Sequence, residues 1–134
     1  MNRKALLIWL FMALVIGGLM AACGEGQSRL VVGMRENHFP GHWQASYTKL
    51  IGTKTDRFQA KAGETLNLGY DVQVDKGMLT LQVENPDDDV VWEVALESDE
   101  AESVEVNLEQ DGRYALRITG EDTSGGWDLA WNVR

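Results

Sequence analysis

The sequence has a single cysteine, two prolines and no long stretch with helical periodicity, and each scarcity removes a class of protein. Because Cys23 is the only cysteine in the chain, neither an intrachain disulfide framework nor a cysteine-based metal site can form. None of the few serines lies in a Gly-x-Ser-x-Gly motif, so the nucleophile elbow of the α/β-hydrolases is absent. The sequence therefore predicts a protein without disulfides, without long helices and without this hydrolase motif.

Basic residues are also scarce, since the chain has 12 of them against 21 acidic residues and a formal net charge of −9. Ten basic and all 21 acidic residues follow residue 22, so that part of the chain carries −11 (10 minus 21). Such a charge repels phosphate backbones and anionic lipid headgroups. We expect no nucleic acid partner, and a cation or a positively charged partner fits the field better. Solubility alone is the simpler explanation of the charge.

The first 22 residues have the organisation of a secretory signal peptide. Two basic residues precede an apolar run over residues 5–16, and Ala21-Ala22 then leads into Cys23. A charged start, an apolar run and small residues before a cleavage site are typical of export signals. An uncleaved anchor over residues 5–22 is the alternative, because its 18 residues are near the lower limit of about 17 for a spanning helix. Both readings leave the rest of the chain outside the cytoplasm.

The cysteine that follows two alanines resembles the lipobox of bacterial lipoproteins. In that family the thiol receives a diacylglyceryl group and cleavage leaves the cysteine as the first residue, which implies lipidation of Cys23. Met20 departs from the family pattern, which usually has Leu, Val or Ile there. Two acyl chains anchor a protein stably. The resemblance implies a lipid-anchored protein on the extracytoplasmic face of the cell membrane, with a tether and loop over residues 23–41.

From residue 42 onward, apolar and polar residues alternate with the period of two that is typical of strands. We expect about eight strands, over residues 42–51, 55–61, 66–74, 79–84, 90–97, 104–109, 114–119 and 127–133. A further short strand over residues 29–34 is left open. Asp75-Lys76-Gly77 is a hairpin signal, and residues 120–126 and Arg35 to Gly41 are expected as loops. Each strand has one apolar face, so two sheets must cover each other. The prediction is an all-β, antiparallel, jelly-roll-like β-sandwich over residues 42–134.

The C-terminal half contains an ordered set of motifs that supports this fold. LTLQVENPDDDVVWEV is followed by an acidic strand and then by DGRYALRITGEDTSGGWDLAWNV. A strand that opens Gly-x-Tyr, then Gly-Gly-aromatic-x-x-x-Trp, resembles the end of bacterial pre-peptidase C-terminal domains and of GOLD-like sandwiches. Small lipoproteins of Gram-positive bacteria, which join a lipobox to one such domain, are similar. The resemblance implies a binding or accessory role and carries over no catalytic residue.

Two groups of residues are candidate metal ligands. Asp87, Asp88 and Asp89 offer the oxygen ligands that Ca²⁺ prefers, but adjacent side chains point in different directions and a solvated turn is the simpler explanation. His38 and His42 are a candidate zinc pair. Because Pro40-Gly41 separates them the segment is not helical, and ordinary loop or strand-edge histidines are the simpler explanation.

Four tryptophans follow the signal peptide, and we expect three of them in the core. Trp92, Trp127 and Trp131 lie on the apolar face of their strands. Trp43, beside the Pro-Gly turn, is instead a candidate for a binding surface.

The leading functional hypothesis is a non-catalytic, lipid-anchored binding or accessory module that engages a protein or a cell-envelope polymer, with no cofactor. One alternative is a structural or envelope-stress lipoprotein without a small ligand. The other is a metal-dependent enzyme that uses His38 and His42.

Lipidation of Cys23 is testable by metabolic labelling with an alkyne-tagged fatty acid. We expect the native chain to incorporate the label and Cys23→Ala to lose it, because the thiol is the only acceptor that the lipobox offers. Ser28→Ala is the matched control and should keep the label. A native chain that stays in the membrane fraction without label would support the uncleaved anchor instead.

Overall fold

Three long strands dominate the computed structural model, which describes residues 29–134. They are β3 (His42–Ala60), β4 (Thr65–Glu84) and β7 (Gly112–Val133). The shorter strands are β1 (Leu30–Val32), β2 (Arg35–Phe39), β5 (Val90–Leu96) and β6 (Glu100–Asn107). In this described range no helix is long and apolar enough to cross a membrane.

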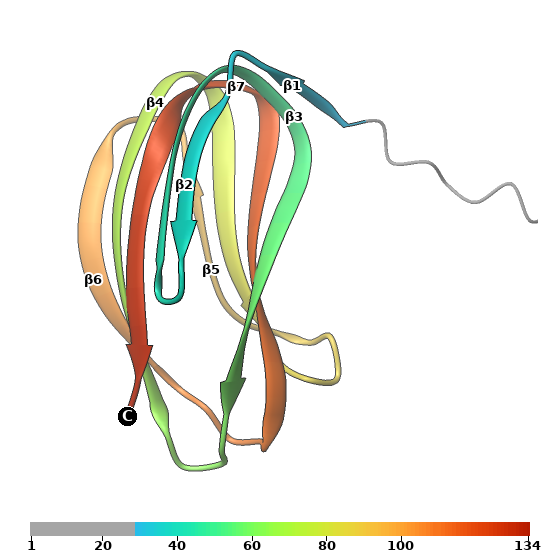
Figure 1. Ribbon diagram of the computed structural model, residues 1–134, viewed down its shortest axis with the longest axis vertical. Coiled ribbons are helices and arrows are strands. Elements are labelled where there is room, and N and C mark those ends of the chain that lie inside the picture. The colour runs from blue at the N-terminus through green and yellow to red at the C-terminus, as the bar shows by residue number, and fades with distance from the viewer. Residues whose placement is uncertain (1–28) are drawn as a thin grey trace, which may run out of the picture.

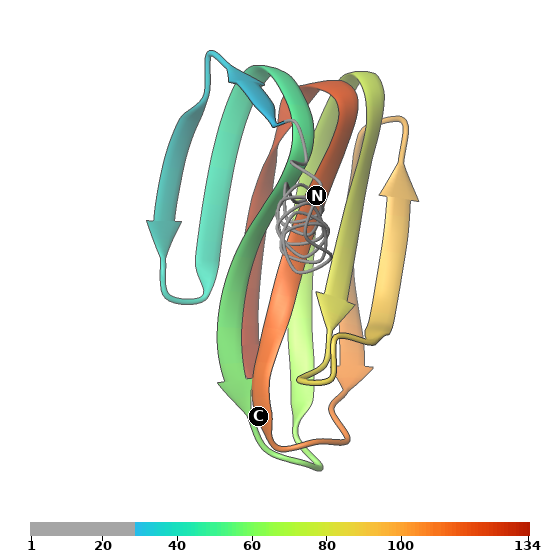
Figure 2. The ribbon, with the colours of Figure 1, turned by 90° about the vertical axis from the view of Figure 1, so that its right-hand side faces the viewer.

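Each long strand runs along one layer of the molecule, bends over at one end and returns along the other layer (Figures 1 and 2). The first half of β3 pairs with the second half of β7, and the second half of β3 pairs with the first half of β7. β4 pairs with both halves of β7 in the same way. The register shifts at the bends, between Tyr47 and Gly52 in β3 and between Val74 and Met78 in β4.

The result is a two-layer antiparallel β-sandwich. The first layer contains β2, the first half of β3, the second half of β7, the first half of β4 and β6, in that order. The second layer contains the second half of β3, the first half of β7, the second half of β4 and β5. β1 pairs with β3 at its bend. The predicted all-β, jelly-roll-like fold class is confirmed.

The core lies between the layers and consists of alternate residues of the long strands. Leu68 and Val72 of β4 and Leu116 and Ile118 of β7 are almost completely buried. Burial of each such side chain contributes about 1.5–3 kcal/mol relative to exposure. Trp127 belongs to the same cluster, and Trp92 and Trp131 pack against it half-buried.

Two predicted interruptions are wrong, because the chain bends there without leaving the sheet. Asp75-Lys76-Gly77 is no hairpin: Val74 pairs with Gly125 and Leu79 pairs with Gly120, so both flanks have β7 as their neighbour. Residues 120–126 are likewise the bend of β7 and not a loop. Glycines with positive φ serve tight turns and bulges alike, so the local sequence does not distinguish the two. A third predicted interruption, between residues 51 and 55, is also wrong, because β3 is continuous there. With β1 and β2 added, seven strands are observed in place of about eight.

The predicted loop from Arg35 to Gly41 is also wrong, since residues 35–39 form β2. The turn at Pro40-Gly41 is real, and it pairs Phe39 with His42 in a hairpin. The strand was missed because it lacks apolar alternation, all five of its residues being exposed. The paired part of the chain begins at Leu30, before the predicted start of the sandwich at residue 42, and β1 lies where the sequence leaves a short strand open over residues 29–34. The signal peptide and Cys23 lie outside the described residues.

The bend of β7 generates a stability prediction. A Cβ on Gly125, which has φ 144°, would lie 1.9 Å from the carbonyl oxygen of Gln73, whereas a Cβ on Gly63, with φ 90°, would meet nothing within 4 Å. Both Gly→Ala changes place alanine at a strained φ, which costs about 1–3 kcal/mol. We expect Gly125→Ala to lower the free energy of unfolding by about 1–3 kcal/mol more than Gly63→Ala, because only Gly125 is sterically enclosed. Urea denaturation measures the difference, and equal losses would contradict the close approach.

Candidate functional site

The outer face of the first layer carries a polar groove of about 410 Å³. Strand alternation produces it: where Trp43, Ala45 and Tyr47 point inward, the residues between them point outward. The outward side chains that line the groove are Arg35, Asn37, Gln44, Ser46, Asp71, Gln73 and Asp128. Gly126 pairs with Ser46 on one side and Gln73 on the other. Because it has no side chain, it leaves the hollow between them.

One row of this groove crosses all the strands of the first layer. Asn37, Gln44, Asp128, Asp71 and Ala101 are successive register partners on β2, β3, β7, β4 and β6. A second hollow, of about 480 Å³ over β4, β6 and β7, shares both aspartates with the first. The two hollows therefore form one track, the polar track, that runs across the strands.

The aspartates are the electrostatic feature of the polar track. Asp71 and Asp128 are directly opposite one another on β4 and β7, an arrangement that is unfavourable for two like charges. His42 Nε2 lies 2.7 Å from Asp128 Oδ1 and offsets one of the charges when the imidazole is protonated. No basic side chain of residues 29–134 forms an ion pair with Asp71.

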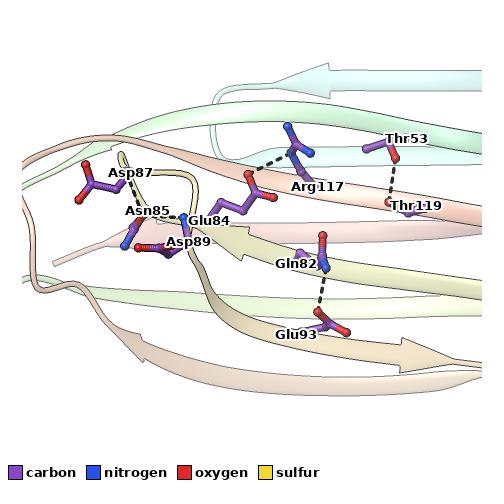
Figure 3. A network of polar contacts seen from close by, with 9 residues as sticks. All are labelled: Thr53, Gln82, Glu84, Asn85, Asp87, Asp89, Glu93, Arg117 and Thr119. Carbon is purple, nitrogen blue, oxygen red and sulfur yellow. Dashed lines mark hydrogen bonds and ion pairs between the residues drawn. The ribbon is translucent and has the colours of Figure 1, made fainter. Parts of the chain in front are cut away.

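On the outer face of the second layer, three pairs of polar side chains contact one another (Figure 3). Thr53 and Thr119 are hydrogen-bonded at 2.9 Å, and Gln82 Nε2 donates to Glu93 at 2.8 Å. Arg117 Nε lies 3.2 Å from Glu84 Oε2. In the first layer, by contrast, the side chains of Arg35, Asn37, Gln44, Ser46, Asp71 and Gln73 make no hydrogen bond to another described side chain. The polar track thus presents free donors and acceptors to a ligand.

A cluster of paired charges closes the side of the sandwich next to β2. Glu36 accepts a hydrogen bond of 2.7 Å from Trp43 Nε1 and forms an ion pair with Lys54. His38 Nε2 lies 2.8 Å from Asp56 Oδ2, and its ring stacks on Trp43 with centroids 5.0 Å apart. These contacts join the first layer to the second half of β3 across the open side. Burial alone acts to raise the pKa of Glu36, but the hydrogen bonds from Lys54 and Trp43 and the charge of Lys54 outweigh it and hold this pKa below its ordinary value.

The structure separates the two histidines of the candidate zinc pair. His38 is the register partner of the buried Trp43 and faces inward, whereas His42 is adjacent along the strand and faces outward, toward Asp128. Over the described range, no group of three or more His, Cys, Asp or Glu side chains is placed to hold a metal ion. The arrangement that the zinc hypothesis needs is absent from these residues.

The candidate calcium ligands lie in the loop between β4 and β5 (Figure 3). The side-chain oxygen of Asn85 accepts hydrogen bonds from the backbone N–H groups of Asp87 and Asp89 at 3.0 and 2.9 Å. Gln110 Nε2 also donates to Asp87 at 3.1 Å. The three exposed aspartates thus form a turn that the side chain of Asn85 stabilises. This arrangement agrees with the solvated turn that was the simpler alternative to a calcium site.

Trp43 is not a surface residue, so its assignment to a binding surface is corrected. Its side chain is 1% exposed and packs edge-on against Trp127 with centroids 5.5 Å apart. It is covered by β2, a strand that the sequence pattern does not predict. The groove residues were missed because they only appeared as the polar positions of separate strands. The Gly125-Gly126 pair was the one local signal of a close approach in this region.

No protein-family model matches the chain, and no curated protein matches it. Solved structures with a similar fold include a CBM4 structure, 11% identical over 77% of this chain and 78% of that one, with a TM-score of 0.48. TmCBM61, solved with β-1,4-galactotriose, is 11% identical over 76% of this chain and 89% of that one, with a TM-score of 0.48. The enzymatically active domain of tailspike protein 4 of bacteriophage CBA120 is 9% identical over 80% of this chain and 19% of that one, with a TM-score of 0.50. At such identities the likeness concerns the fold alone.

The Glu36 contacts generate a pH prediction. Because the folded pKa lies below the ordinary value of 4.5, ionised Glu36 stabilises the protein above that pH, and this contribution is lost as the pH falls through the folded pKa. We expect Glu36→Gln to lower the free energy of unfolding at pH 7 by about 1 kcal/mol, and by less below pH 4.5. Urea denaturation from pH 7 to pH 3 measures this. The exposed Glu109→Gln is the control, and a Glu36→Gln loss that does not change with pH would contradict the pairing.

Proposed function

We propose that this chain is a lipid-anchored, non-catalytic binding module on the extracytoplasmic face of a bacterial membrane, and that its polar track holds a neutral, polyhydroxylated polymer of the cell envelope. The observation that supports this best is the set of polar side chains on the polar track that make no hydrogen bond to another described side chain, namely Arg35, Asn37, Gln44, Asp71 and Gln73. The anchor at Cys23 is inferred from the lipobox-like sequence.

The chemistry of the side chains favours a polyhydroxylated ligand. Gln44, Gln73 and Asn37 each offer both donors and acceptors, and a hydroxyl group can use either. The large apolar side chains of the first layer face the core, and small residues such as Ala101 and Ala130 provide apolar surface in the second hollow. Anionic polymers are disfavoured because the chain after the signal peptide is strongly acidic.

The shape of the track favours a linear polymer over a small molecule. Its central row passes over five strands, which are about 4.8 Å apart, so the row spans about 19 Å. Side chains along the row recur once per strand. An extended chain of repeating units can make the same type of hydrogen bond at each step, whereas a compact ligand would occupy only part of the row.

The placement of the aspartates argues against hydrolysis of such a polymer. Glycoside hydrolysis needs two carboxyl groups that flank the scissile bond. Asp71 and Asp128 are neighbours on the floor of one sheet, so both approach a ligand from the same side. They are suited to accept hydrogen bonds from hydroxyl groups.

The test is binding of the full chain, kept in a detergent without a sugar headgroup, to isolated cell-wall polysaccharide and to peptidoglycan. We expect Gln44→Ala to weaken retention about fivefold, since it removes one amide from the central row. Gln59→Ala is the matched control, because Gln59 is an exposed glutamine on the same strand but in the second layer. Equal affinity of the two variants, or no retention of the native chain, would overturn the proposal.

A further inference from the structure

Besides the polar track, the sandwich has an opening below the tip of the hairpin formed by β2 and β3. The hairpin ends at Pro40-Gly41, while β7 and the second half of β3 continue beyond it (Figures 1 and 2). The N–H of Trp131 donates to the carbonyl of Gly41 at 2.9 Å, which attaches the tip to β7. Past this point the first layer has no strand on that side of β7, so Trp131 is only half-buried.

A pocket of about 490 Å³ occupies this opening. Its walls come from the hairpin tip, from the second half of β3 and from the end of β7, and they include His38, Phe39, Asp56, Arg57, Phe58 and Trp131. This volume lies within the range of small-molecule sites, about 300–1,000 Å³. It is separate from the polar track, which shares none of these residues.

Aromatic residues from three segments line the pocket, namely Phe39, Phe58 and Trp131. Phe39 is 61% exposed, more than any other large apolar side chain of residues 29–134. Phe58 stacks on Tyr114 with centroids 5.5 Å apart, which holds its ring in place at the border of the core. Trp131 forms the wall on the side of the first layer. The face of a ligand ring that carries C–H groups can pack against such aromatic side chains.

Polar groups accompany the rings in the same pocket. Oδ2 of Asp56 lies 2.8 Å from His38 Nε2. The other carboxylate oxygen of Asp56 makes no hydrogen bond within the described range. Arg57 forms no ion pair with a described residue. The pocket therefore contains side chains of both charges, Asp56 and Arg57.

The combination of aromatic rings and polar groups in the pocket favours a neutral, hydroxylated ring over an apolar or a charged ligand. A purely apolar side chain of a protein partner would displace water from Asp56, Arg57 and His38 without replacing its hydrogen bonds, which is unfavourable. A charged ligand would meet a like charge in the pocket. A neutral ring with C–H groups on its faces and hydroxyl groups on its edge satisfies both the rings and the polar groups.

We infer that this pocket binds a single neutral sugar ring, at a site distinct from the polar track. The site supplies a second point of attachment for the same chemical class of ligand. The inference holds whether or not the polar track binds a polymer, because the two sets of residues do not overlap.

The probes are glucose, galactose, mannose and N-acetylglucosamine, each titrated into the isotope-labelled full chain in a zwitterionic detergent and followed by NMR. We expect at least one sugar to shift the Trp131 indole N–H resonance saturably, with a Kd of about 1–10 mM. Phe39→Ala and Arg57→Ala change exposed residues and should each weaken this binding about fivefold. Val91→Ala is the control, since Val91 is an exposed apolar residue on β5, at the opposite edge of the second layer.

The outcomes separate this inference from the proposed function. Shifts at Trp131 without shifts at Gln44 or Gln73 support the pocket, and the polar track is then decided separately by retention on cell-wall polysaccharide. Shifts at Gln44 and Gln73 alone overturn the pocket and leave the polar track supported. If N-acetyl-tyrosine amide shifts Trp131 while no sugar does, the pocket accepts a protein side chain and the inference is wrong. Absence of any saturable shift also overturns it.

Discussion

The bends of β3, β4 and β7 are the constraint on which the rest of the molecule depends. At these bends backbones approach so closely that Gly125 would place a Cβ 1.9 Å from the carbonyl oxygen of Gln73, and Gly77 would place one 2.4 Å from that of Asp122. Only glycine combines positive φ with the absence of a side chain at such contacts. Because the same three strands build both layers, the layers cannot slide or separate independently.

At the bends, the alternation between core-facing and outward-facing side chains shifts by one residue. In β4 the buried positions are even-numbered up to Val74 and odd-numbered from Leu79, and in β7 they likewise change from even to odd between Ile118 and Trp127. An extra residue in a bulge shifts the alternation by one, which would otherwise turn the apolar face outward. The apolar pattern of the sequence and the register shifts of the structure therefore agree, and one continuous core results.

The sites are consequences of how this core is covered. β2 covers Trp43 on one side, and its inward residues Glu36 and His38 are paired with charges of β3 instead of contributing to an apolar core. The hairpin is shorter than the strands beside it, so aromatic residues of the core border remain accessible below its tip. On the outer face, Gly126 serves the close packing of β7 against β3, where its Cβ would lie 2.5 Å from the oxygen of Ala45, and it also leaves the groove open. Packing requirements and candidate binding surfaces thus arise from the same residues.

The sequence by itself determined the fold class, the apolar face of most strands and the place of Trp127 in the core, because a period of two in apolar residues is a local property that survives in any antiparallel sandwich. It also determined the turns at Pro40-Gly41 and around Asn85. The tertiary structure alone decided that residues 75–77 form a bend and not a hairpin, since this depends on pairing with β7, far along the chain. It also decided that the exposed strand β2 exists, and that Gln44, Asp71 and Asp128 lie in one row. Register between distant strands is set by the packing of the whole sandwich, and no local pattern encodes it.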